Sequence, residues 1–278
     1  MNKRFLSLLV FLVFFLTACQ PNVKNDIKDT QPHQSSEDTS TDEPEWEFSW
    51  DTLEARTFAL RNRTLQRQDP QDLYQLKYQL LSPPNKNGVV PESVRTYWYA
   101  YVSFNLILVE ESFGESDQVK RLLIETIQTL DSIENKSVEV RALLAILYRL
   151  RVKHEPDNTF ELVLSMQDHL DAAIKLDSEN LRTKVAQTML AVRPIPGFGI
   201  DEDVEATIHQ ALEVSPTNAS LTHSPTWGRS MIFQLWLEWL ALRDENSEFM
   251  KVLNRATLEF PEDVYLQQAT DELLDLLE

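Results

Sequence analysis

Apolar residues recur every three or four positions from Trp50 to the end of the chain, and no long window alternates between apolar and polar residues. A spacing of three and four is typical of amphipathic α-helices, whereas strict alternation would indicate β-strands. The pattern predicts helices at 50–68, 70–81, 91–112, 116–131, 137–153, 158–176, 179–192, 201–214, 227–243, 246–259 and 262–277. The chain is therefore expected to be all-α, with about 10 to 11 helices.

Prolines, glycines and acidic residues mark the ends of these predicted helices. Breaks are expected at Pro83-Pro84, Gly114, Pro156, Pro216 and Pro261, and along the segment 193–199. Proline ends a helix because it lacks the backbone N–H and clashes with the preceding turn. The acidic residues at 201–203 and 262–263 are expected in first turns, where negative charge suits the positive end of the helix dipole.

Three short phrases indicate a repeat. The sequences AIKLDSEN, ALEVSPTN and ATLEFPED begin at Ala173, Ala211 and Ala256, and each closes one helix and opens the next. They resemble the junctions between tetratricopeptide repeats, although the spacings of 38 and 45 residues exceed the period of about 34 in that family. Loops must therefore be inserted, at 193–199 and 219–226. The resemblance implies an irregular tetratricopeptide-like array of five helix pairs, with 262–277 as a C-terminal capping helix.

The N-terminus has the organisation of a secretory signal. Lys3 and Arg4 precede an apolar run from Phe5 to Leu16, and the tetrapeptide LTAC follows, ending at Cys19. At 1.5 Å per residue this run covers about 18 Å, too short for a stable transmembrane helix. The tetrapeptide resembles the lipobox of bacterial lipoproteins, which implies that residues 1–18 are cleaved and Cys19 is lipidated. An ordinary signal with an incidental cysteine is the alternative.

The chain beyond the signal divides into a tether and a domain. Residues 19–45 are rich in Ser, Thr, Asp, Glu and Pro and hold too few apolar residues to order themselves. Such a tether spans about 25 to 30 Å on average and holds residues 46–278, the helical-repeat domain, near the membrane. Gln20 after the cysteine resembles the outer-membrane sorting class, so an outer-membrane anchor facing the periplasm is expected.

Charge and cysteine content exclude several kinds of partner and site. The formal net charge is −18, and it becomes more negative when Lys3 and Arg4 are removed. Such a surface repels nucleic acid and anionic lipid headgroups, so the membrane is expected to be reached through the lipid. Cys19 is the single cysteine, which excludes an intrachain disulfide and a Cys-based zinc site. No two histidines stand four residues apart, and neither a metal nor another cofactor is expected.

Residues 170–278 resemble a known kind of helical lipoprotein. A helix, the proline-glycine loop RPIPGFGID, a helix ending in ALEVSPTN, an aromatic helix and a terminal pair follow in order. This order, with the lipobox, resembles the T component associated with tripartite ATP-independent periplasmic (TRAP) transporters. The resemblance implies a periplasmic protein partner, and it leaves oligomerisation open because residues 50–150 have no clear counterpart.

Aromatic helices supply the candidate binding residues. Stripes at helical spacing run through 91–112 and 227–243, and core packing is the simpler explanation of most of their members. Both helices also carry aromatics off the stripe, so each has two apolar faces that need two neighbours, or one neighbour and a ligand. Because the first helices of tetratricopeptide pairs line a groove, the groove candidates are Trp98, Tyr101, Trp227, Arg229 and Trp236.

The loop residues Pro196, Gly197, Phe198 and Gly199 are a second candidate surface, since binding residues often lie on loops. A simple helix breaker is the alternative for this loop. Arg229 could pair with a carboxylate of a ligand, but the excess of acidic residues favours an internal partner.

Two further functions stay open beside a non-catalytic binding protein. One is a scaffold for the assembly of outer-membrane proteins or pili, since such lipoproteins also use tetratricopeptide repeats. The other is a cell-wall lytic transglycosylase, because Glu110-Glu111-Ser112 resembles the Glu-Ser segment of those enzymes. An acid at Glu111 would need a raised pKa in an enclosing pocket. The glycine-rich substrate segment of those enzymes is absent, so no catalytic residue is expected.

Overall fold

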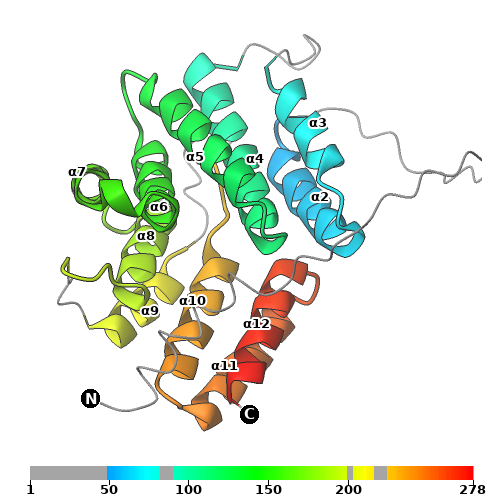
Figure 1. The fold of residues 1–278 in the computed structure, drawn as a ribbon, viewed down its shortest axis with the longest axis vertical. Helices are drawn as coiled ribbons and strands as arrows, with labels where there is room; N and C mark the ends of the chain where they lie inside the picture. The colour runs from blue at the N-terminus through cyan, green and yellow to red at the C-terminus, as the bar shows by residue number, and fades with distance from the viewer. Residues whose placement is uncertain (1–48, 82–89, 199–202, 216–223, 278) are drawn as a thin grey trace, which may run out of the picture. The chain divides into compact units, whose positions relative to one another are not determined.

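The computed structural model of the chain describes residues 49–81, 90–198, 203–215 and 224–277. Within these ranges the chain forms α-helices and a single 3-10 turn, and no β-strand (Figure 1). The helices are α2 (Leu53–Arg67), α3 (Gln71–Gln79), α4 (Glu92–Ser112), α5 (Ser116–Asp131), α6 (Val138–His154), α7 (Thr159–Leu176), α8 (Leu181–Val192), α9 (Val204–Glu213), α10 (Arg229–Leu242), α11 (Asn246–Glu259) and α12 (Val264–Leu277). The all-α prediction is confirmed, and each predicted helix has an observed counterpart.

The N-terminal predictions concern residues that the structure does not describe. The signal at 1–18, the lipidated Cys19 and the tether to residue 45 lie outside the described ranges. Among the helices that are described, none combines the length and the apolar character that a membrane span needs.

Two helices begin later than predicted because acidic residues cap them from outside. Asp203 precedes α9, and its Oδ1 accepts a hydrogen bond from the N–H of Ala206 at 3.1 Å. Asp263 precedes α12 in the same way and accepts from the N–H of Leu266 at 3.2 Å. A carboxylate at the N-cap satisfies an N–H group that has no partner within the helix. These two residues are therefore caps, and the prediction that placed them within the first turn is wrong.

Helix α10 also begins later than predicted, at Arg229 instead of residue 227. Gly228 has φ of 125°, a conformation that L side chains rarely adopt, so the helix cannot extend through it. A Cβ at this glycine would lie 2.9 Å from Cγ2 of Val185 on α8. The segment before α10 thus packs directly on α8, and Trp227 belongs to this segment instead of the helix.

The helices form an array of consecutive pairs. α2 packs with α3, α4 with α5, α6 with α7, α8 with α9, and α10 with α11. The alanines of the three repeat phrases, Ala173, Ala211 and Ala256, are fully buried. A buried alanine lets two helix backbones approach closely, which is the role that the repeat phrases predicted. The described chain is therefore a helical-repeat array.

The array closes on itself through its last helix. The first helices of the pairs touch one another in order, α2 with α4, α4 with α6, α6 with α8 and α8 with α10. Helix α12 packs on α10 and α11 and also on α2, the first described helix, whose lower end lies next to the upper end of α12 in Figure 1. In an open solenoid each repeat contacts only its neighbours, so the two ends would not meet. The predicted capping helix is therefore also the element that joins the ends.

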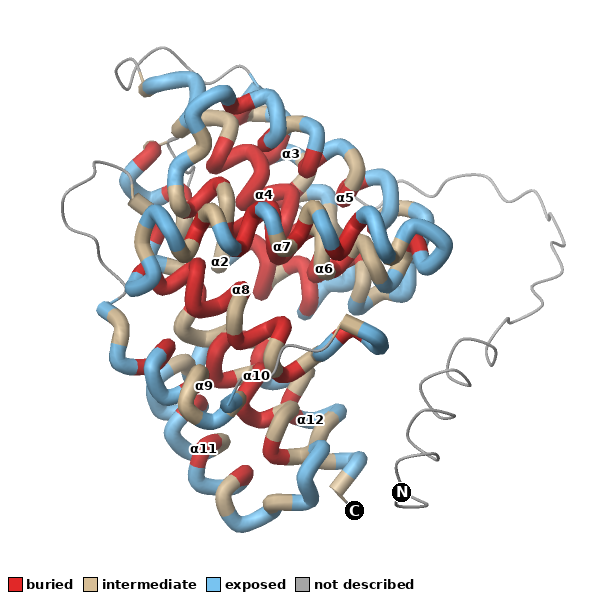
Figure 2. The backbone as a smooth tube through the Cα atoms, turned by 90° about the vertical axis from the view of Figure 1, so that its left-hand side faces the viewer, coloured by how far each residue is buried: buried red, intermediate tan, exposed pale blue. Residues whose placement is uncertain are grey.

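The first helices form the core, and the second helices cover them. Every residue from 97 to 110 of α4 is buried, and α8 is buried along most of its length, whereas α7 and α11 expose one face (Figure 2). Helix α4 contacts α2, α3, α5 and α6, so protein neighbours surround it. A helix that is apolar on all sides requires such enclosure. For α4, the two apolar faces are thus explained by neighbouring helices.

Candidate ligand-binding cleft

A cleft of about 780 Å³ opens among the first helices. Its walls are the inner faces of α2, α4 and α10, the start of α12, and the segment 224–228 that leads into α10. Such a volume is within the range of sites that hold small molecules, about 300 to 1,000 Å³. The lining is mainly aromatic and apolar, and a few charged side chains interrupt it.

Four of the five groove candidates line this cleft. Trp98 and Tyr101 come from α4, Trp227 comes from the segment 224–228 that precedes α10, and Arg229 comes from the first turn of α10. Trp236 does not line it. Its side chain is buried, and its ring packs edge-on to the His209 ring of α9 at 5.1 Å between centroids. The periodicity of α10 predicted its apolar positions, but the direction in which Trp236 points depends on the packing of α9.

The aromatic wall is fixed by ring contacts and one hydrogen bond. Trp227 stacks on Tyr101 with 5.6 Å between ring centroids and an interplanar angle of 27°. Its Nε1 donates a hydrogen bond to the hydroxyl of Tyr97 at 2.9 Å. Trp98 and Tyr101 are almost fully buried, whereas Trp227 is half-buried. Trp227 is therefore the aromatic side chain of this wall with the most surface left for a ligand.

Glu54 of α2 ties the Trp227 segment to the opposite wall. One carboxylate oxygen accepts from the backbone N–H of Thr226 at 2.7 Å, and the other accepts from the Thr226 hydroxyl at 2.6 Å. Burial raises the pKa of the Glu54 carboxyl, although the two hydrogen bonds and the charge of Arg182 offset part of this shift. Glu54 is thus a partly desolvated carboxylate that positions the residue next to Trp227.

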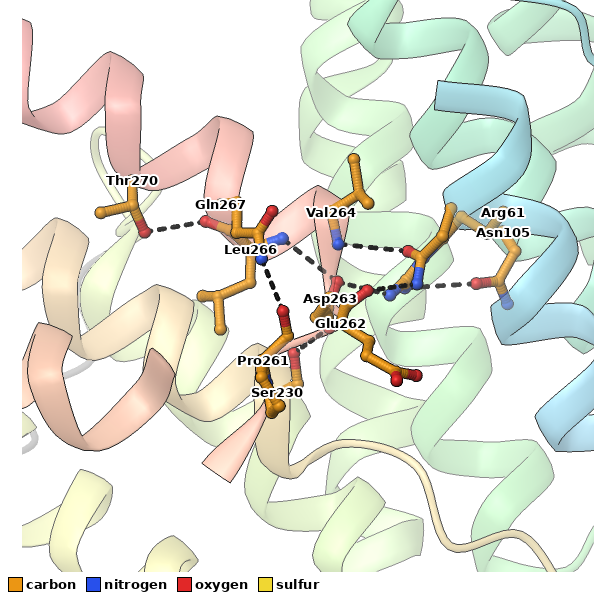
Figure 3. Close-up of polar contacts among 11 residues, drawn as sticks. Arg61, Asn105, Ser230, Pro261, Glu262, Asp263, Val264, Leu266, Gln267 and Thr270 are labelled. Atoms are coloured by element: carbon orange, nitrogen blue, oxygen red, sulfur yellow. Dashed lines mark hydrogen bonds and ion pairs between the residues drawn. The ribbon is translucent and has the colours of Figure 1, made fainter. Parts of the chain in front are cut away.

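The ion pair between Arg61 and Asp263 forms the floor of the cleft and joins α2 to α12 (Figure 3). Nη2 of Arg61 donates to Oδ1 of Asp263 at 2.8 Å, and both side chains are buried. Ser230 donates to the other carboxylate oxygen, and Asn105 of α4 accepts from Nη1 of Arg61 at 3.4 Å. The guanidinium also lies over the rings of Phe58 and Tyr265, at 5.0 and 5.4 Å from their centroids.

A second contact beside this ion pair joins the same two elements. The side-chain amide of Asn62 donates to the carbonyl of Glu262 at 2.6 Å and accepts from the N–H of Val264 at 3.3 Å. The asparagine thereby satisfies one acceptor and one donor of the backbone at the start of α12. The closure of the array is therefore polar and directional at its centre.

Arg229 is held by the protein itself. Its guanidinium pairs with the Glu259 carboxylate of α11 and donates to the carbonyl of Leu212 at the end of α9. These two partners tie the last turns of α9 and α11 to the start of α10. Because both partners are internal, Arg229 reaches the cleft edge as a neutralised cation.

The proline-glycine loop lies apart from the cleft lining. Within it, Ile195 and Phe198 form an isolated bridge around a turn in which Gly197 has φ of 83°. The Phe198 ring packs at 6.2 Å from the Phe160 ring of α7. Neither Pro196 nor these loop residues line the cleft, and Gly199 lies outside the described residues. The turn brings Phe198 back onto the protein.

Glu111, the candidate acid of the transglycosylase alternative, lies at the end of α4 beside the end of α6. Its Oε1 accepts from Nζ of Lys153 at 2.7 Å and lies 3.6 Å from Nε2 of His154. Burial would raise the pKa of Glu111, but the contact with His154 and the charge of Lys153 lower it to about 2. A general acid needs a shift in the opposite direction.

Sequence reasoning missed three residues that shape the cleft. Glu54, Arg61 and Asp263 each hold a partner on another element, and the partners of Glu54 and Arg61 lie 172 and 202 residues away. The acidic start of α12 was a visible signal for Asp263 as a helix-terminal residue. No local pattern pointed to Glu54 or Arg61, because their role depends on which helices meet.

The fold and the cleft together define an all-α helical-repeat protein whose first helices surround a ligand-sized space. No protein-family profile matches the chain, and no curated protein matches it. A similar solved structure is the HusA haemophore from Porphyromonas gingivalis, with 17% sequence identity, a TM-score of 0.49, and coverage of 70% of this chain and 96% of that chain. A likeness at this level assigns neither a family nor a ligand to the chain.

Proposed function

We propose that this chain is a non-catalytic, lipid-anchored protein that binds a partner protein or ligand in the cleft among α2, α4, α10 and the start of α12. The observation that carries the proposal is the cleft, with its aromatic wall and its few fixed charges. Concave sites of this kind, mostly apolar with a small number of placed polar groups, are typical of ligand binding. The signal and Cys19 support a lipid anchor, and Gln20 after the cysteine supports the outer membrane, facing the periplasm, as its location.

The resemblance of residues 170–278 to the T component of TRAP transporters suggests the setting. In that setting the partner is a periplasmic substrate-binding protein. The net charge of −18 supports a protein or small-molecule partner over nucleic acid. The low pKa of Glu111 argues against this residue as a general acid, which is the role that the transglycosylase alternative requires of it.

Site-specific crosslinking in cells tests the partner. A photo-crosslinking amino acid at Ala59, an exposed residue of α2 that lines the cleft, should give one defined adduct with a periplasmic substrate-binding protein. The control position is Gln128, which is exposed on α5 outside the cleft lining and should give no such adduct. Equal adducts at both positions, or a β-barrel or pilus protein at Ala59, would refute the TRAP association.

Fractionation tests the anchor. Cys19→Ser should move the protein from the membrane fraction to the soluble fraction, because the lipid is proposed to be the membrane attachment. The helical content, measured by circular dichroism, should stay unchanged, since the tether is expected to carry no part of the domain. A variant that stays in the membrane fraction would show that Cys19 is not the anchor.

A further inference from the structure

The charges that line the cleft are unevenly matched. The lining carries four carboxylates and two guanidiniums, from Asp51, Glu54, Glu262, Asp263, Arg61 and Arg229. Both arginines are paired with carboxylates of the chain, Arg61 with Asp263 and Arg229 with Glu259. Glu54 and Glu262 form no ion pair with any described residue. The cleft therefore has a surplus of negative charge and no free cation among its described arginines.

Of Glu54 and Glu262, the two carboxylates without an ion pair to a described residue, Glu54 is the more buried. Thr226 donates two hydrogen bonds to it, and neither of them brings a positive charge. The nearby cation, Arg182, is buried and already paired with Glu139, at 3.1 Å between Nη2 and Oε1. A desolvated carboxylate without a cation of its own is stabilised by any cation that reaches it.

The chain already shows how this cleft holds a cation. The guanidinium of Arg61 lies between the Asp263 carboxylate and the rings of Phe58 and Tyr265. Glu54 also lies near aromatic side chains, because its charge acts on the hydroxyls of Tyr97 and Tyr101, and its partner Thr226 is followed in the chain by Trp227, which stacks on Tyr101. At Asp263, Arg61 occupies the space between the carboxylate and the aromatic rings. At Glu54, no side chain of the described residues supplies a corresponding cation.

We infer that the cleft binds an organic cation, an ammonium or guanidinium carried on an apolar body, with the charge at Glu54 and the apolar part against Trp227. Aromatic faces attract cations, and the attraction strengthens where water is excluded. The cleft has room for a small molecule or for one or two side chains of a peptide. The inference rests on the proposed function, since it names the chemistry that the proposed binding cleft selects.

Calorimetric titration of the full-length chain in dodecyl maltoside micelles tests the charge preference, with titrations into micelles alone as blanks. The probes are phenethylamine, the peptide acetyl-Phe-Arg-amide, and the anion 3-phenylpropionate. Both cations should bind at least tenfold more tightly than the anion. The tighter of the two cations identifies the source as a small amine or a basic peptide.

Variants locate the site. Glu54→Gln keeps an acceptor for Thr226 and removes the charge. It should lower the affinity for both cations at least fivefold, and the ratio of cation affinity to anion affinity should not rise. Trp227→Leu should also weaken both, with unchanged circular dichroism. The matched control is Glu161→Gln, an exposed carboxylate of α7 outside the cleft lining, which should leave all three affinities unchanged.

The outcomes separate this inference from the proposed function. Equal binding of anion and cations, or an unchanged affinity in Glu54→Gln, overturns the cation site. If crosslinking from Ala59 still captures its partner in that case, the cleft remains a binding site and only the ligand chemistry is wrong. If neither the cation preference nor the adduct at Ala59 is observed, both the cation site and the proposed binding cleft are overturned.

Discussion

The substitution Asp263→Asn tests the closure of the array at its centre. It retains an oxygen at the Oδ1 position that can cap α12 through the N–H of Leu266, and its amide NH2 can donate to the Ser230 hydroxyl, but it removes the charge that faces Arg61. Arg61 would then be a buried cation without a carboxylate, surrounded only by neutral amide oxygens and two aromatic rings. Removing one member of a buried ion pair costs about 3 to 5 kcal/mol, because the other charge stays desolvated.

Three comparisons isolate the charge. Asp263→Ala also removes the cap and should cost about 1 kcal/mol more than Asp263→Asn. Asp72→Asn is the exposed control, because Asp72 pairs with Arg63 at 3.5 Å and its side chain is 45% exposed. An exposed pair contributes about 0 to 1 kcal/mol, so this change should be small. Adding Arg61→Met to Asp263→Asn should restore part of the loss, since no unpaired charge would remain buried.

Urea unfolding followed by circular dichroism measures these free energies, and amide hydrogen exchange locates them. Exchange in Asp263→Asn should rise first in α12 and in the facing part of α2, because repeat arrays lose stability locally before they unfold as a whole. If Asp263→Asn costs no more than Asp72→Asn, or if the exchange of α12 is unchanged, the ion pair does not hold the array closed.

Three further predictions concern packing and pH. Gly228→Ala should lower the free energy of unfolding in urea by about 2 to 3 kcal/mol, because its Cβ would meet Val185 at 2.9 Å. The control Gly114→Ala has open space around a φ of 79° and should cost about 1 kcal/mol. Equal costs for the two variants would contradict the close packing at Gly228. Ala173→Leu should cost about 1 to 3 kcal/mol because the site is fully buried, and the same change at the half-buried Ala172 beside it should cost clearly less. Glu111 has a pKa lowered from 4.5 to about 2, so its stabilising contribution is complete above about pH 4.5 and is lost as the pH falls toward 2. The full shift corresponds to about 3 kcal/mol, and screening around the exposed Lys153 reduces the expected loss to about 1 to 2 kcal/mol. In Glu111→Gln the free energy of unfolding should therefore depend less on pH below pH 4.5. If it falls in acid as steeply as in the unmodified protein, the pairing of Glu111 with Lys153 and His154 is refuted.

The sequence was sufficient to predict the helices because the information for them is local. Apolar spacing and proline breaks lie within each segment, and the buried Ala173, Ala211 and Ala256 could be recognised from the phrases that contain them. The aromatic content of α4 likewise predicted a helix that needs neighbours on more than one side. These properties do not depend on which helices come together.

The closure and most of the cleft could not be predicted, because they depend on contacts between distant segments. Trp236 and Trp227 both belong to apolar runs near α10, yet one faces α9 and the other faces the cleft. The rotation of a helix about its axis is set by its neighbours, which periodicity does not name. The partners of Arg61 and Glu54 have no local signature for the same reason.

The position of Arg61 links binding to closure. Arg61 lines the cleft and also joins α2 to α12, so a ligand that extends from Glu54 to Arg61 contacts both ends of the array. A ligand that binds only the closed arrangement stabilises it by mass action, by about 1.4 kcal/mol at ten times its dissociation constant. Saturating phenethylamine should then slow amide exchange in α12 about tenfold, and Glu54→Gln should abolish the effect at the same concentration. Slower exchange in α7, which lies outside the cleft lining, would indicate general stabilisation instead of a link through the floor.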